Sequence, residues 1–318
     1  MAKVIDILNT PNTKFTFEIV PPLKGSTIED ISQTIETLLP YNPSYINVTS
    51  HRAETVLVDK GNGTFSKKVV TKRPGTVGVS ASIKFKYGVE VIPHIICGGF
   101  SAEETEDALF DLQFLGIQNV LALRGDALKG ERTFTPETNG HSNANELVRQ
   151  ISNMNQGVFL TPDLKNQNNA KFCIGVAGYP EKHIEAPNME TDLRHLKDKV
   201  DTGAEYIVTQ LFFDNKKYFQ FVENCRKIGI NVPIIPGIKP VSLLANLNNL
   251  PQIFHIDLPE DLAREVEKCK TNADVRIVGI EWAIEQCKEL KAANVPALHF
   301  FTLGSTAKSI AEIVKTVY

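Results

Sequence analysis

The sequence predicts an α/β fold, a (β/α)8 TIM barrel with extra helices before the last strand. Helical periodicity fills most of the gaps between short apolar runs of strand length, and this alternation favours a parallel sheet. Several runs end in polar residues, such as Arg124-Gly125-Asp126 after Asn119–Leu123, as expected of a rim where catalytic side chains gather. The eight predicted strands are 15–20, 44–49, 90–95, 119–124, 172–177, 206–210, 233–237 and 297–302.

Caps and glycine stops predict the helices between these strands. Residues 259–294, with Pro259 near the start and Pro296 after the end, predict one or two long helices before the last strand. Segments 127–143 and 155–170 are rich in Asn, Gly, Thr and Lys, and we expect both to be long surface loops on the active rim. We expect one domain over residues 1–318. The other predicted helices are 28–39, 101–115, 145–154, 190–202 and 215–227.

An open doubly wound sheet is the alternative architecture. Such a sheet usually has a glycine-rich turn after its first strand. Here Pro21-Pro22 follows the first strand, and the near match Gly61-Asn-Gly63 follows no clear strand and lacks a third glycine. The barrel is therefore favoured.

Composition narrows the functional class. The 318 residues are 42% hydrophobic and 22% charged with a net charge of -3, which gives no general electrostatic reason to bind nucleic acid or an anionic membrane. No apolar run approaches the roughly 20 residues of a membrane helix, and the N-terminus has no signal-peptide core. Five cysteines without a CxxC pair predict free thiols, buried at Cys97 and Cys173, and hence a cytoplasmic protein.

Glu18 is the first candidate for chemistry. Period-2 alternation places Phe15, Phe17 and Ile19 on one face of the first strand, so Glu18 points into the barrel if that face meets the helices. Desolvation there would raise the pKa of the carboxyl group, and a neutral carboxylic acid can serve as a general acid. A buried glutamate in a structural ion network is the alternative.

Other strand ends carry further candidates. Arg124 could clamp a phosphate or close its own loop by pairing with Asp126, and Gly125 allows a tight turn. His94 follows Pro93 at a strand end and could be a functional residue or a core histidine hydrogen-bonded to backbone. Gln210 could bind a polar heterocycle or neighbouring backbone.

The next group of candidates lies between the fifth and sixth predicted strands. Lys199 could bind a phosphate or could be an ordinary solvated lysine. His183, Asp192 and His195 lack the spacing of a tight metal site, so we expect no metal.

Taken together, the segments resemble the methylenetetrahydrofolate reductase family, catalytic domain only. They occur in family order from residue 15 to about 303, and LRGD, AGYPEKH and TQLFFD are the most specific. The matching segments are FTFEIVPP, INVTSH, IPHIIC, VLALRGD, VAGYPEKHIEA, DLRHLKDKVDTGAEYIVTQLFFD, IIPGIKPVS and LHFFTL.

The resemblance implies FAD bound in the barrel and a ping-pong hydride relay. NADH or NADPH reduces the flavin, and 5,10-methylenetetrahydrofolate then receives the hydride to give 5-methyltetrahydrofolate for methionine synthesis. It implies Glu18 as general acid, Asp126 at the pterin and flavin, and Gln210 with Thr49 at the substrates. The flavin contacts that it implies are Thr49, His94, Arg124, Gly125, Asp126, Tyr179, His183, Ala186, Asp192 and Lys199.

The chain departs from relatives at Ser50, where an aromatic is frequent, at Gly304-Ser305, where many have Asn-Arg with the arginine on folate, and at Leu250, where some have phenylalanine. A flavoprotein that takes electrons from a partner protein, and a folate- or flavin-binding protein without turnover, remain alternatives. The resemblance also implies a homo-oligomer. Because the chain ends about one helix past the last strand, we expect no S-adenosylmethionine-sensing domain.

Overall fold

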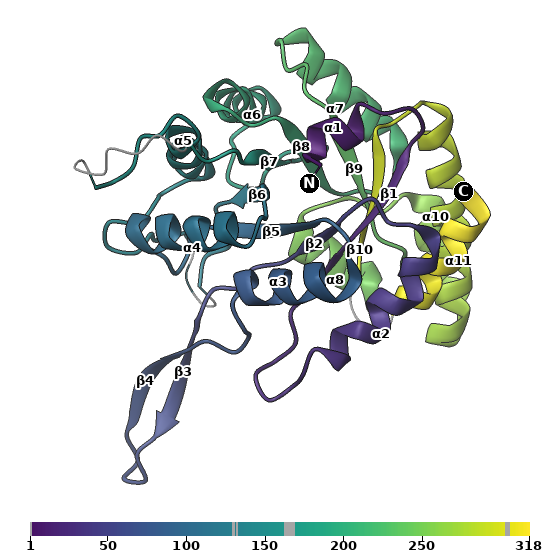
Figure 1. The fold of residues 1–318 in the computed structure, drawn as a ribbon. Helices are drawn as coiled ribbons and strands as arrows, with labels where there is room; N and C mark the ends of the chain where they lie inside the picture. Colours follow the sequence, from purple (N-terminus) through teal and green to yellow (C-terminus); the bar gives the residue numbers. More distant parts are fainter. Residues whose placement is uncertain (1, 129–130, 132, 162–168, 303–305) are drawn as a thin grey trace.

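A closed barrel of eight parallel strands forms the centre of the molecule (Figure 1). The computed structural model describes residues 2–128, 131, 133–161, 169–302 and 306–318. Around the barrel the strand order is β1-β10-β9-β8-β7-β6-β5-β2, and all eight predicted strands are present within two residues of their expected bounds. The predicted barrel is confirmed. Its strands are β1 (Lys14–Ile19), β2 (Ile46–Val48), β5 (Val91–Ile96), β6 (Asn119–Leu123), β7 (Cys173–Gly178), β8 (Tyr206–Leu211), β9 (Ile234–Ile238) and β10 (Ala297–Phe301).

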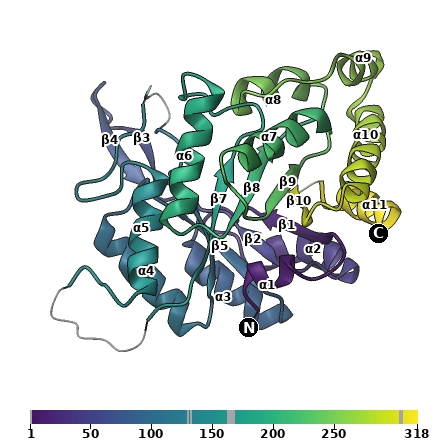
Figure 2. The ribbon, with the colours of Figure 1, turned by 90° about the horizontal axis from the view of Figure 1, so that it is seen from above.

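Helices surround the strands, as Figure 2 shows from above. The segment predicted to hold one or two long helices before the last strand holds two, α9 and α10, and α8 precedes them. A capping box at Thr271 separates α10 from α9. The helical elements are α1 (Val4–Leu8), α2 (Glu29–Leu38), the 3-10 helix η1 (Leu39–Tyr41), α3 (Thr76–Tyr87), α4 (Ala102–Phe114), α5 (Ala144–Asn155), α6 (Met189–Thr202), α7 (Asn215–Lys227), α8 (Asn246–Phe254), α9 (Glu260–Lys268), α10 (Asn272–Ala292) and α11 (Ala307–Val317).

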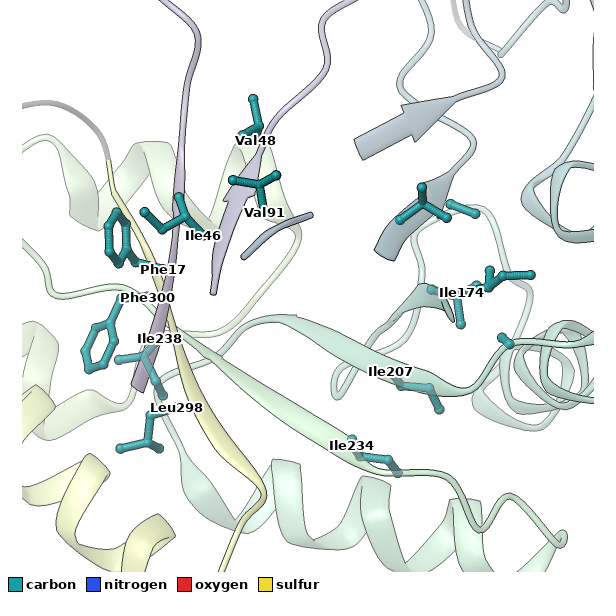
Figure 3. Packing of buried hydrophobic residues seen from close by; sticks show 14 of the residues in the cluster. Phe17, Ile46, Val48, Val91, Ile174, Ile207, Ile234, Ile238, Leu298 and Phe300 are labelled. Atoms are coloured by element: carbon teal, nitrogen blue, oxygen red, sulfur yellow. The ribbon is translucent and has the colours of Figure 1, made fainter. Parts of the chain in front are cut away.

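The main hydrophobic core lies between the strands and the helices. Phe17 of β1 packs there beside Phe300 and Leu298 of the neighbouring β10 (Figure 3). Since successive side chains of a strand point to opposite faces, this packing turns Thr16 and Glu18 toward the barrel interior. The predicted inward orientation of Glu18 is therefore confirmed.

Helix α1 closes the amino-terminal end of the barrel. Its Val4 and Leu8 are buried in a second hydrophobic cluster with residues of the strand bottoms. Asn119, at the start of β6, holds this helix: its side chain accepts a hydrogen bond from Val4 N at 2.8 Å and donates one to Ala2 O at 3.2 Å.

We expect Asn119→Ala to lower the free energy of unfolding by about 1–3 kcal/mol, because it leaves a buried backbone N–H without an acceptor. Urea denaturation measures the change. A midpoint equal to that of the unmodified protein would show that the α1 contact adds nothing to stability.

An antiparallel hairpin, β3 (Glu54–Asp59) and β4 (Phe65–Val70), follows β2 and projects away from the barrel (Figure 1). Gly61 and Gly63 form its turn with positive φ angles of 77° and 75°. The interpretation that these glycines follow no clear strand is therefore wrong. Much of the hairpin is exposed to solvent, so it lacks the alternation that marks a strand with one buried face.

The two long connections lie at opposite ends of the barrel. Residues 127, 128 and 143 line the cavity at the carboxyl end, as expected for the first connection. The second runs from α5 to the start of β7, where Asn155 bonds Phe172 and Leu160 N donates to Glu106. For its described residues the prediction that the connection 155–170 lies on the active rim is wrong, because a chain leaving a helix returns to the amino end of the next strand. Residues 129–130, 132 and 162–168 are outside the described part.

The five cysteines are free, and Cys97 and Cys173 are buried as predicted. Within the described ranges, no helix has both the length and the apolar character needed to cross a membrane.

Candidate active site

A cavity of about 1180 Å³ opens at the carboxyl ends of the barrel strands. Residues from all eight strands or the loops that follow them line it, together with residues of α5, α6 and α8. Every candidate residue of the sequence analysis borders this one space. These residues are Glu18, Thr49, His94, Arg124, Gly125, Asp126, Tyr179, His183, Ala186, Asp192, Lys199 and Gln210.

Glu18 lies between two imidazole rings. Its Oε2 atom is 3.9 Å from His94 Nε2 and 3.8 Å from His299 Nε2, and its side chain is only 14% exposed. Thr302 donates a hydrogen bond to the Glu18 backbone oxygen, which fixes the end of β1 against the end of β10. The carboxyl group is thus held at the inner wall of the cavity.

The rings beside Glu18 are themselves held by hydrogen bonds. Asn47 Nδ2 donates to His94 Nε2 at 3.2 Å, so the His94 ring, which lines the cavity, is held by a side chain rather than by backbone. His299 Nδ1 is 3.0 Å from Thr16 Oγ1, while its buried Nε2 has no hydrogen-bond partner in the described part of the chain. Burial lowers the pKa of His94 to about 4, and the nearby charge of Glu18, which acts to raise this pKa, does not offset it. The ring is therefore neutral at pH 7.

The lowered pKa of His94 predicts a pH dependence of stability. Below pH 6.5 the unfolded chain binds a proton that the folded ring refuses until about pH 4, so folding becomes less favourable as pH falls through this window. The shift corresponds to roughly 3 kcal/mol. We expect His94→Gln to lose less stability than the unmodified protein between pH 6.5 and pH 4 in urea titrations. Parallel curves for the two proteins would contradict this.

The loop after β6 is turned by Gly125, whose φ angle is 83°. Arg124 pairs through both terminal nitrogens with Glu185, at 2.5 Å and 2.8 Å, and stacks on the ring of Phe134 at 5.0 Å. The alternative of an Arg124–Asp126 pair closing the loop is therefore wrong. Asp126 is exposed toward the cavity.

The loop after β7 meets the start of α6 at the same cavity. Tyr179 and His183 form an edge-to-face pair with centroids 4.7 Å apart, and His183 N donates to Asp192 Oδ2 at 2.9 Å. Lys199 Nζ donates to Ala177 O at 2.9 Å, and burial lowers its pKa to about 8. Lys199 is thus not a freely solvated lysine. Its ammonium group is held against the backbone carbonyl of Ala177 in β7, just before the loop.

Gln210 closes β8. Its Oε1 accepts a hydrogen bond from Leu211 N at 2.9 Å, and its Nε2 has no partner among the described residues. The acceptor therefore serves the backbone, as one of the two sequence interpretations allows. The donor remains for a ligand in the cavity.

The residues present fit a flavin dinucleotide. A cavity larger than the usual range for small ligands carries two cationic side chains, Arg124 and Lys199, that suit a diphosphate. It also contains buried polar atoms without partners, Thr49 Oγ1 and Asn145 Oδ1, and Asn145 lies in the first turn of α5. The N-terminus of a helix favours the binding of an anion such as a phosphate.

Several lining residues escaped the sequence analysis, among them Lys239, Phe254 and Phe301. Phe254 lies one turn after Leu250, which is buried in a hydrophobic cluster and does not border the cavity. The aromatic contact expected to be missing at position 250 is thus available from the next turn of α8. Ser305 is outside the described residues. Within the described ranges there is no cluster of metal-ligating side chains.

Comparison with known proteins agrees with this architecture. The chain matches the methylenetetrahydrofolate reductase family over residues 3–318. It is 32% identical over 318 residues to methylenetetrahydrofolate reductase (NADH) 1 of Arabidopsis thaliana, covering 97% of this chain and 49% of that protein. It is 30% identical over 297 residues to 5,10-methylenetetrahydrofolate reductase of Escherichia coli K12, covering 93% of this chain and 88% of the relative.

The chain spans about half the length of the plant relatives that it matches. Among solved structures, a Clostridium thermocellum protein that binds two copies of 5-methyl-5,6,7,8-tetrahydrofolic acid has a similar fold, with a TM-score of 0.55 at 15% identity, covering 96% of this chain and 98% of that one. At this identity the likeness concerns the fold alone. The match over residues 3–318 and the identity to the bacterial enzyme show that the chain belongs to the methylenetetrahydrofolate reductase family.

Proposed function

We propose that the protein reduces 5,10-methylenetetrahydrofolate to 5-methyltetrahydrofolate with electrons from NADH or NADPH, by way of FAD. The observation that carries the proposal is Glu18, a nearly buried acid between His94 and His299 at the wall of a cavity that also holds cationic side chains for a diphosphate. A protein that only binds folate has no need of an acid so placed. Family membership supports the same reaction.

The flavin is assigned to the side of the cavity formed by β5, β6, β7 and α6. Arg124 and Lys199 balance the diphosphate charge, Gly125 lets the backbone approach the ring system, and Thr49 Oγ1 supplies a buried hydrogen-bonding group. His94, Tyr179, His183, Ala186 and Asp192 complete this side. When bound, FAD provides the hydride-carrying chemistry that no side chain supplies.

The opposite side of the cavity is assigned to the substrates. Glu18 donates a proton to a ring nitrogen of the folate, which opens the five-membered ring to a reactive iminium. Asp126 and Gln210 hold the pterin, and the unpartnered Nε2 of Gln210 is the donor for this contact. The nicotinamide occupies the same space before the folate, so the two substrates alternate.

Stopped-flow spectroscopy of the purified protein tests the proposal. The protein should be yellow, NADH or NADPH should bleach the flavin absorbance without oxygen, and methylenetetrahydrofolate should restore it. Colourless protein, or bleached protein that the folate does not reoxidise, would reject the assignment. Comparison of the two nicotinamide cofactors in the first step determines the preferred donor, since relatives of both kinds are known.

We further propose that the chain acts as one FAD-binding catalytic domain in the cytoplasm. The five free cysteines support a reducing compartment. A homo-oligomer, which sedimentation analysis would detect, is part of the same proposal.

A further inference from the structure

Lys239 is a buried lysine that the proposed mechanism does not use. It follows β9 directly, is only 5% exposed and lines the cavity. Ile238 before it packs in the core between strands and helices, so strand alternation turns Lys239 toward the interior. A lysine is among the residues least often buried without a partner.

The position of Lys239 brings it to the level of the proposed acid. β9 pairs with β10 through Ile238 and Phe300, and β10 pairs with β1 through Phe301 and Glu18. Continuing the register by one residue places Lys239 beside Phe301. The acid and the lysine therefore flank one aromatic side chain on three adjacent strands.

Lys239 differs from the other cations that line the cavity. Arg52 pairs with Glu137, Arg124 pairs with Glu185, and Lys199 bonds a backbone carbonyl. Lys239 Nζ has neither a hydrogen bond nor an ion pair within the described ranges. Burial lowers the pKa of Lys239, and the charge of Glu18 opposes this effect. A buried cationic group without a partner is costly, so an acceptor in the cavity would stabilise it.

The neighbours of Lys239 show which ligand would supply the acceptor. Arg124 and Lys199 belong to the flavin side. Lys239 lies with Glu18, Gln210, Phe254 and Phe301 on the side assigned to the substrates. Since Glu18 acts only on the folate, a group at its level faces that substrate in the second step.

We propose that Lys239 is a substrate-recognition residue that donates a charge-assisted hydrogen bond to an oxygen of the folate. This inference rests on the proposed function. A folate offers two sources of such an oxygen, the carbonyl of the pteridine ring and the carboxylates of the glutamate tail. Both accept strongly from an ammonium group.

Equilibrium titration with 5-methyltetrahydrofolate, followed through the flavin absorbance, tests the inference. Lys239→Met keeps the apolar stem and removes the donor, and we expect binding to weaken about tenfold to a hundredfold. The visible absorption spectrum of the bound flavin should be unchanged in this variant, which shows that the variant is folded and loaded. Separate titrations with a tetrahydropterin and with p-aminobenzoylglutamate identify the source, because only the fragment carrying the bonded oxygen should lose affinity.

Lys84→Met is the matched control. Lys84 lies in α3, pairs with Glu90 and does not line the cavity, so folate binding should be unchanged. If the unmodified protein binds 5-methyltetrahydrofolate and Lys239→Met binds it equally well, the inference is overturned while the proposed function stands. An equal loss of NADH affinity, or loss of flavin, also overturns it. Failure of the unmodified protein to bind the folate would instead reject the proposed function.

Discussion

Glu18→Gln is expected to retain reduction of the flavin by NADH and to lose reduction of the folate by at least about a hundredfold, the usual contribution of a positioned general acid. Glutamine has the shape of glutamic acid and fits between His94 and His299, but it cannot release a proton to a ring nitrogen. Because the first half-reaction requires no proton from this residue, only the second should slow. Stopped-flow absorbance, recorded separately for bleaching and recovery, resolves the two steps.

The neighbours of Glu18 make this separation sharp. His94 is neutral at pH 7 because burial lowers its pKa to about 4, so it cannot replace the missing acid. Glu90→Gln is a suitable control, since Glu90 is paired with Lys84 outside the cavity. Recovery at a near-normal rate in Glu18→Gln would remove Glu18 from the mechanism. Slowing of both steps together would indicate a general disturbance of the site.

Gly175→Ala is expected to lower the free energy of unfolding by about 3 kcal/mol or more, which combines overpacking with a weakened buried hydrogen bond. A Cβ atom on Gly175 in β7 would lie 2.2 Å from Cζ and 2.6 Å from the hydroxyl oxygen of Tyr206. Tyr206 is fully buried and donates to Val120 O at 3.2 Å, so its ring has no free space to move into. Urea denaturation monitored by circular dichroism measures the loss.

Gly78→Ala provides the comparison for this substitution. Gly78 lies within α3, and a Cβ atom there would meet no heavy atom within 4 Å. Because alanine favours the helix over glycine, this variant should gain roughly 0.5–1 kcal/mol. A Gly175→Ala protein as stable as Gly78→Ala would show that the barrel interior adapts to the added methyl group.

The barrel strands were predictable because burial on both faces produces apolar runs that stop at polar rim residues. The run Asn119–Leu123 followed by Arg124 is one example, and it identifies both a strand and its functional end. Glu18 and Gln210 also lie near the ends of such strands. Although they are far apart in sequence, they border one cavity, as the barrel predicts. Local pattern and barrel closure together were sufficient for this part.

What the sequence missed depends on partners that only the fold brings together. Arg124 pairs with Glu185 rather than with Asp126, which is nearer in sequence, because the loops after β6 and β7 meet at the cavity. The β3–β4 hairpin has little buried surface to mark its strands. Nothing in the local sequence distinguishes Lys239, which precedes Pro240, from a surface lysine. Its inward orientation follows only from strand alternation in the closed barrel.

The packing of α1 against the amino-terminal end of the barrel has a consequence for the order of folding. Val4 and Leu8 of α1 pack against side chains from several strands, including Leu121 of β6 and Ala297 of β10, which lie up to almost three hundred positions later. Their docking surface does not exist until the ring of strands has closed. This segment is synthesised before the strands that it contacts but is among the last to dock, and a probe attached near residue 4 would report completion of the ring.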